Sequence, residues 1–160
     1  MRTPSLAFFV AMVLLLVTSG VLAQNRAFVA HLSGHEEVPP VHTRAQGQAV
    51  FRVSSDGLHI HYQVNVANIS DITQAHIHLA GVGMNGPVVA WLYPAAPPSV
   101  LMPGRFQGVL AAGVITEANL VGPLAGQTLG DLMERIQAGE TYVNLHTLAH
   151  PAGEVRGQIQ

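Results

Sequence analysis

The sequence predicts an all-β fold: an antiparallel, Greek-key-like β-sandwich of about eight strands with one short helix, after an N-terminal signal peptide. Three observations support this prediction. Short segments alternate between apolar and polar residues, as half-buried strands do. Turn-forming residues separate these segments at intervals of roughly 8–12 residues, which is typical of sandwiches and barrels. Only one segment shows the 3.6-residue period of an amphipathic helix.

The strands are expected wherever alternation is bounded by turn chemistry. They cover residues 26–32, 46–54, 58–66, the segment that carries His76 and His78, and then 87–93, 105–115, 141–147 and 153–159. The helix is expected over 128–137, where Leu129, Leu132, Met133 and Ile136 recur on one face. The length of 160 residues predicts a single domain.

The first 23 residues are expected to be a secretory signal peptide. Arg2 precedes an uncharged apolar run over residues 6–17, and the small residues at 21–23 suit cleavage after Ala23. The run is short for a membrane span, although an uncleaved anchor is the alternative interpretation. The mature domain would cover residues 24–160, secreted or periplasmic, with no membrane attachment after cleavage.

The composition excludes several classes of function. The mature chain would keep six arginines and nine acidic residues, a net charge of −3, and it has no lysine, so we expect no nucleic-acid partner. Cysteine is absent, which excludes disulfides, a lipidated cysteine and thiolate chemistry. A transition-metal site would have to use histidine, carboxylate or backbone ligands, and nine histidines are available.

The candidate site centres on two histidines separated by one residue. In a strand, His76 and His78 share one face, while Ala75, Ile77 and Leu79 share the core face. Three or four imidazoles with an open position would make a usable copper or zinc site. The alternative is a set of hydrogen-bonded, half-exposed histidines on a polar sheet face.

A third histidine is expected on the same side. Tyr142, Asn144 and His146 alternate against two apolar residues, so His146 also projects from the non-core side of its strand. Asn144 and Glu154 are candidates to orient the ligating rings. His150, in a loop before a proline, could move towards the site.

A hairpin would add two more ligands. If residues 67–70 form a four-residue loop, His61 lies opposite His76 and His59 lies opposite His78. The hypothesis is therefore a square of imidazoles: His59, His61, His76 and His78.

Three other features have a structural and a functional interpretation. Glu36 and Glu37, before paired prolines, are expected to be a rigid, solvated strand terminator, the alternative being an oxygen ligand. For Glu154 and Arg156 on the last strand, an ion pair is expected. Trp91 is expected to pack on the sheet rather than to form a ligand platform.

Four blocks of the chain resemble the CHRD domain family. They are Leu32-Ser33-Gly34 with residues 36–40; Ala75-His76-Ile77-His78 with residues 85–89; Gly139 with residues 142–147; and residues 151–159. The resemblance covers about residues 28–159. The family is named after chordin, an extracellular antagonist of growth factors, and it also occurs as a lone domain in secreted bacterial proteins. The resemblance implies an extracellular domain and assigns no activity.

A weaker resemblance is to copper/zinc superoxide dismutase, a Greek-key sandwich. His76 and His78 look like its paired copper ligands, His146 looks like its late ligand, and Arg156 is a loose counterpart of its guiding arginine. The family's disulfide and its zinc-binding loop have no counterpart.

Three functions follow from these patterns. The first is an exported CHRD-domain binding protein whose histidine face holds a copper or zinc ion or binds an unknown protein. The second is a copper-dependent, superoxide dismutase-like oxidoreductase. The third is a metal-free extracellular structural or adhesion domain.

Overall fold

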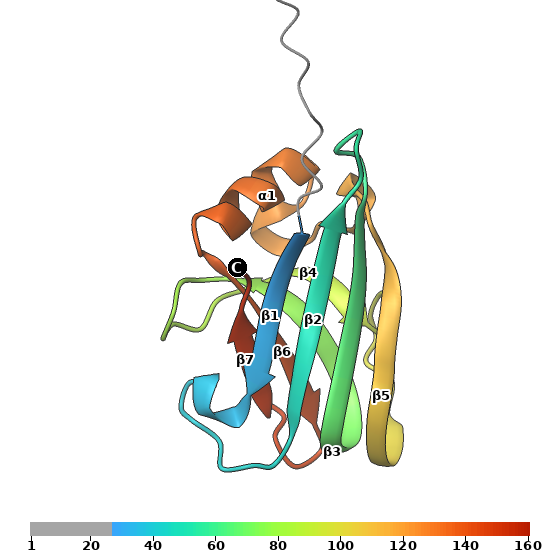
Figure 1. The fold of residues 1–160 in the computed structure, drawn as a ribbon, viewed down its shortest axis with the longest axis vertical. Helices are drawn as coiled ribbons and strands as arrows, with labels where there is room; N and C mark the ends of the chain where they lie inside the picture. Colours follow the sequence, from blue (N-terminus) through green and yellow to red (C-terminus); the bar gives the residue numbers. More distant parts are fainter. Residues whose placement is uncertain (1–26) are drawn as a thin grey trace, which may run out of the picture.

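A computed structural model describes residues 27–160, and the predicted signal peptide, residues 1–23, lies outside them (Figure 1). The strands are β1 (Ala27–Ser33), β2 (Gln46–Val53), β3 (Ile60–Leu79), β4 (Val88–Tyr93), β5 (Met102–Ile115), β6 (Thr141–Thr147) and β7 (Val155–Gln158). One α-helix, α1 (Leu129–Gln137), and three short 3₁₀ turns, η1 (Gly34–Glu36), η2 (Glu117–Asn119) and η3 (Gly122–Leu124), complete the described part. None of the helices there is long and apolar enough to span a membrane.

Strand β3 organises the molecule. It is a single strand of 20 residues, and the segment 67–70, predicted to be a hairpin loop, lies inside it. Asn68 and Asp71 adopt positive φ values of 55° and 53°, and the pairing with β5 shifts register there. These residues therefore produce irregularities within the strand, and the predicted hairpin is wrong.

The two halves of β3 have different neighbours. Its first half pairs antiparallel with β2 and β5, whereas its second half pairs antiparallel with β4 and β6. β6 continues to β7, β7 meets β1 at the Arg156–Ser33 pair, and β1 pairs with β2. The strands β1, β2, β3, β6 and β7 thus form a closed ring of pairings.

The all-β antiparallel prediction is confirmed, with two differences in detail. The structure has seven strands rather than about eight, because two predicted strands are one, and the sheet closes on itself rather than forming two separate layers. Buried apolar side chains from every strand make one core, which includes Phe51, Val64, Ile77 and Leu145.

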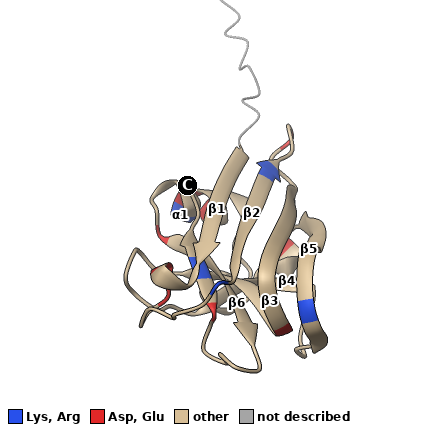
Figure 2. Cartoon of the chain, turned by 60° about the horizontal axis from the view of Figure 1, so that its bottom comes forward, with Lys and Arg blue, Asp and Glu red and all other residues tan. Residues whose placement is uncertain are grey.

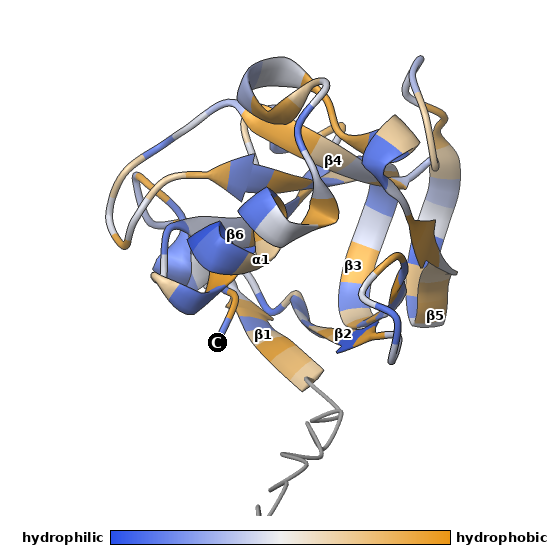
Figure 3. Cartoon of the chain, turned by 90° about the horizontal axis from the view of Figure 1, so that it is seen from above, coloured by the Kyte–Doolittle hydropathy of each residue, from blue (hydrophilic) through white to orange (hydrophobic). Residues whose placement is uncertain are grey.

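The predicted helix is confirmed almost to the residue. α1 begins after Thr128, whose side chain accepts a hydrogen bond from the Asp131 N–H, and Asp131 reciprocates as a capping box. Leu129, Leu132 and Ile136 face the core. The helix lies at one end of the sheet, and its polar side faces solvent (Figures 1 and 3).

Charged residues are sparse on the fold. Figure 2 shows isolated Arg, Asp and Glu positions separated by long uncharged stretches, with no extended basic surface among the described residues.

Candidate metal centre

Two neighbouring strands bring the three central histidines together. His76 and His78 lie on β3, and His146 lies on β6 opposite Gln74. Asn144 is directly opposite His76, so His146 is diagonal to His76 on the same face. Ala75, Ile77 and Leu145 point to the opposite face and are buried in the core, as the alternation predicted.

The three imidazoles form a compact, buried cluster. The ring centroid of His76 lies 5.5 Å from that of His78 and 5.1 Å from that of His146. Each ring offers one nitrogen such that all three nitrogens lie within 4.8 Å of one another. The three residues are only 3%, 8% and 7% exposed, so the alternative of half-exposed histidines on a solvated face is wrong.

Backbone carbonyls fix the orientation of two rings. His78 Nδ1 lies 2.8 Å from the Gly86 carbonyl oxygen, and His146 Nδ1 lies 2.9 Å from the Pro151 carbonyl oxygen. A carbonyl can only accept, so each Nδ1 carries the proton and donates it. In the neutral ring, Nε2 then presents a lone pair, and neither Nε2 has a hydrogen-bond partner among the described residues.

His76 has the fewest hydrogen bonds of the three histidines. Neither of its ring nitrogens has a hydrogen-bond partner within the part of the chain that the structure describes, although both are buried. Its ring instead makes edge contacts with His78, His146 and Trp91, the last at a centroid distance of 4.3 Å. Trp91 therefore covers the cluster, which agrees with its predicted packing role.

Burial keeps the cluster neutral. Together with the smaller effect of the adjacent His146 and His78 rings, it lowers the pKa of His76 to about 3. Burial also lowers the pKa of His78 and of His146, against the opposing effect of their bonds to Gly86 and Pro151. Neutral imidazole is the form that binds a metal ion.

An aromatic and cationic stack supports His78. The Tyr142 ring is stacked on His78 at a centroid distance of 4.8 Å and an interplanar angle of 9°. Arg156, on β7, places its guanidinium carbon 3.4 Å from the centroid of the Tyr142 ring. Since β6 lies between β3 and β7 in the sheet, Tyr142 is held between His78 and Arg156.

Arg156 also anchors the loop that covers the site. The arginine is 2% exposed, and it donates to Asn85 Oδ1 and to the carbonyl oxygens of Gly81 and Met84 at 3.1, 3.3 and 2.8 Å. Gly86 in the same loop donates its N–H to the Tyr142 hydroxyl. The loop that supplies the His78 partner is therefore held by Arg156 and Tyr142.

A family model described as the CHRD domain matches residues 28–159, nearly all of the described chain. The chain belongs to the CHRD domain family. Chordin from Xenopus laevis is 26% identical over 146 residues, and chordin from Danio rerio is 29% identical over 147 residues. These alignments cover 90% and 91% of this chain but only 14% of each chordin, so the chain spans a small part of these relatives. No solved structure matches the chain.

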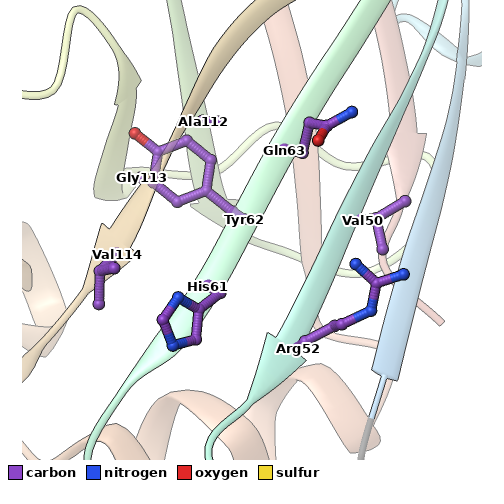
Figure 4. Close-up of a pocket in the computed structure, with 8 residues that line it drawn as sticks. All are labelled: Val50, Arg52, His61, Tyr62, Gln63, Ala112, Gly113 and Val114. Carbon is purple, nitrogen blue, oxygen red and sulfur yellow. The ribbon is translucent and has the colours of Figure 1, made fainter.

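Two of the predicted histidines lie elsewhere in this CHRD domain. His59 lies just before β3 and His61 at its start; both are exposed, and His61 pairs with Arg52 and Val114 rather than with His76. Figure 4 shows His61 beside Arg52 in a shallow hollow on the outer face of β2, β3 and β5. The square of imidazoles is therefore wrong, because 15 positions along one strand separate His61 from His76 by tens of ångströms. The loop residue His150 is half-buried outside the three-histidine cluster.

The acidic residues also differ from expectation. Glu154 does not orient a histidine; it accepts hydrogen bonds from the Thr43 and Thr147 hydroxyls, each at 2.7 Å. Glu37 is not a solvated terminator, because it is 5% exposed, while its neighbour Glu36 is exposed. Burial raises the pKa of Glu37 to about 7, and the nearby charge of Arg156 opposes this rise. The predicted ion pair between Glu154 and Arg156 is therefore not found among the described residues, and the carboxyl whose pKa Arg156 lowers is that of Glu37.

The resemblance to superoxide dismutase is limited to the histidines. His76, His78 and His146 do converge, as that resemblance implied. Arg156, however, is buried and engaged with the covering loop, whereas a guiding arginine must be accessible to an incoming anion.

Proposed function

We propose that this CHRD-domain protein is exported and holds one transition-metal ion, copper or zinc, between His76, His78 and His146. The observation that carries the proposal is the convergence of three buried, neutral imidazoles, with the Nε2 lone pairs of His78 and His146 left unpartnered. The export rests on the apolar segment at residues 6–17, which precedes a suitable cleavage position.

Burial of the three histidines costs free energy when no metal ion accepts their lone pairs. A buried polar group without a partner costs about 1–3 kcal/mol, and the three rings contribute four such nitrogens. Protonation cannot relieve this cost near neutral pH, because burial lowers the pKa of all three histidines. A metal ion accepts the lone pairs without adding a hydrogen-bond donor.

The geometry needs only small adjustments. Ligand distances of about 2.0–2.1 Å in a tetrahedral site place the donor nitrogens about 3.3 Å apart. The nitrogens now lie within 4.8 Å of one another, so a ring rotation that moves each nitrogen by about 1 Å brings all three to ligand distance of one ion. The Gly86 and Pro151 carbonyls are the type of outer partner that orients metal-bound histidines.

Elemental analysis of untagged protein tests this function. We expect about one equivalent of copper or zinc in the wild type, and an affinity at least a hundredfold lower in His78→Ala. His61→Ala is the matched control, because it removes an exposed histidine from the same strand, and it should bind metal like the wild type.

The single tryptophan gives a second measurement. Trp91 contacts His76, so copper(II) bound at the cluster should quench its fluorescence, whereas zinc should not quench it. Equal metal content in the wild type and in His78→Ala would refute the site. A wild type that takes up no metal would leave the structural or adhesion domain as the function.

A further inference from the structure

Two buried acceptors beside the histidine cluster lack donors. Glu37 Oε1 and Asn144 Oδ1 have no hydrogen-bond partner in the described part of the chain, and both residues are at most 5% exposed. These residues take no part in the three-histidine ligand set. Each orphaned acceptor carries a desolvation cost that a donor in the site would remove.

Both acceptors lie beside the histidines. Asn144 is directly opposite His76 on the neighbouring strand, and its amide lies beside both Glu37 and His78. Gly153 packs directly against both residues, because a Cβ at this position would collide with Glu37 Oε1 and approach Asn144 Nδ2. Gly153 also adopts a φ of +131°, which a side chain would strain.

The number of unpartnered acceptors suggests which ligand they hold. Within residues 27–160, three histidines and no further His or carboxylate group form the ligand set, which leaves a four-coordinate ion with one open position. A water on that position has two O–H groups, and Glu37 Oε1 and Asn144 Oδ1 are two acceptors that need donors. The two acceptors of Glu37 and Asn144 therefore match the two O–H donors of one water molecule.

We propose that Glu37 and Asn144 hold an exchangeable water as the fourth ligand of the metal ion. This inference rests on the proposed function, since it requires an ion at the three histidines. A carboxylate beside the open position favours water and repels small anions. Glu37 is thus a specificity-determining residue, which keeps the position for water.

Azide binding to the copper(II)-loaded protein tests the role of Glu37. Azide is a small anion that produces a charge-transfer absorption band when it enters a copper(II) site. Well above pH 7, we expect azide to bind weakly to the wild type and at least tenfold more tightly to Glu37→Gln, because the repelling charge is gone. Glu36→Gln is the matched control and should resemble the wild type, since Glu36 is exposed.

The outcomes separate this inference from the proposed function. Copper content is measured first, and a wild type without copper at the three histidines overturns both proposals. A copper-loaded wild type and Glu37→Gln with equal azide affinity, or with no azide band at all, overturn only the fourth-ligand assignment.

A second variant covers the case in which Glu37→Gln does not fold. Asn144→Asp keeps the shape of the side chain and adds a negative charge directly beside the histidines, so azide should bind at least tenfold more weakly than in the wild type. An unchanged azide affinity in that copper-loaded variant overturns the inference.

Discussion

At the scale of single residues, Arg156 links most of the groups around the histidine cluster. It contacts the Tyr142 ring, donates to three acceptors in the covering loop and lies close enough to Glu37 to oppose the rise of that residue's pKa. The sequence pattern placed Arg156 on the last strand but could not identify its neighbours, because the covering loop and Glu37 are more than 70 residues away in the chain.

Replacing Arg156 should destabilise the fold strongly. We expect Arg156→Met to lower the free energy of unfolding by about 3 kcal/mol, since it leaves buried acceptors and the Glu37 carboxyl without their cation. Urea denaturation measures the change. Arg52→Met, which removes an exposed arginine, should stay within about 0.5 kcal/mol of the wild type. Equal losses in the two variants would contradict the anchoring role of Arg156.

The metal-free protein should lose stability in mild acid. The unfolded histidines protonate below about pH 6.5, whereas burial lowers the pKa of the three folded ones, so acidification favours the unfolded chain by up to about 1.4 kcal/mol per pH unit for each histidine. Glu37 acts in the opposite direction between about pH 7 and pH 4.5, because burial raises its pKa. Each of these groups changes stability by about 1.5 kcal/mol over this range, and three histidines oppose one carboxyl, so we expect a net loss of up to about 3 kcal/mol between about pH 6.5 and pH 5.

Urea unfolding of chelator-treated protein across this range measures the effect. His76→Leu should remove one titrating group and reduce the loss by about 1.5 kcal/mol. An unaltered pH dependence in that variant would show that His76 does not stay neutral in the fold.

At the scale of secondary-structure elements, the main error of prediction lies in β3. Asn68 and Asp71 are residues that favour turns, and the same positive φ that permits a turn also permits an irregularity inside a strand. Local alternation cannot distinguish the two, because it reports the face of each residue and not its partner strand. The prediction that His76, His78 and His146 share one face was correct because it depends only on alternation within each strand.

The loop between β3 and β4 gives an element-scale prediction. A Cβ on Gly86 would collide with the Leu79 carbonyl, so Gly86→Ala must displace the backbone that supplies the His78 acceptor. We expect a 10- to 100-fold weaker metal affinity, as for other lost outer-shell contacts. Gly81→Ala is the control, since its Cβ would make only an ordinary contact with the Met84 methyl group. Isothermal titration compares the variants, and equal affinities would refute the role of the loop.

At the scale of the whole molecule, the all-β class, the helix and one domain could be predicted, whereas closure of the sheet could not. Closure depends on β1 meeting both β2 and β7, and that long-range pairing leaves no local signature. The burial of Glu37 has the same origin, because the segment after β1 is covered only once residues from the C-terminal strands lie against it.

Metal binding should stabilise the whole fold. An ion that binds only the folded chain adds about 2.7 kcal/mol at a free concentration of 100 times Kd, which corresponds to a rise in Tm of about 10 °C for a domain of this size. Differential scanning calorimetry with zinc, at equal protein concentrations, measures the shift. His78→Ala should show little change, and an equal shift in that variant would mean that zinc stabilises the fold from another position.

The distance in sequence between β3 and β6 determines when such an ion can be captured. A growing chain presents His76 and His78 first, and His146 follows only after nearly 70 further residues. Glu37 and Arg156, which flank the cluster, are separated by almost the whole domain. Under the proposed function, the ion would therefore bind only after β6 has been synthesised, and a prematurely terminated chain that lacks β6 would offer a two-donor site with little capacity to retain an ion.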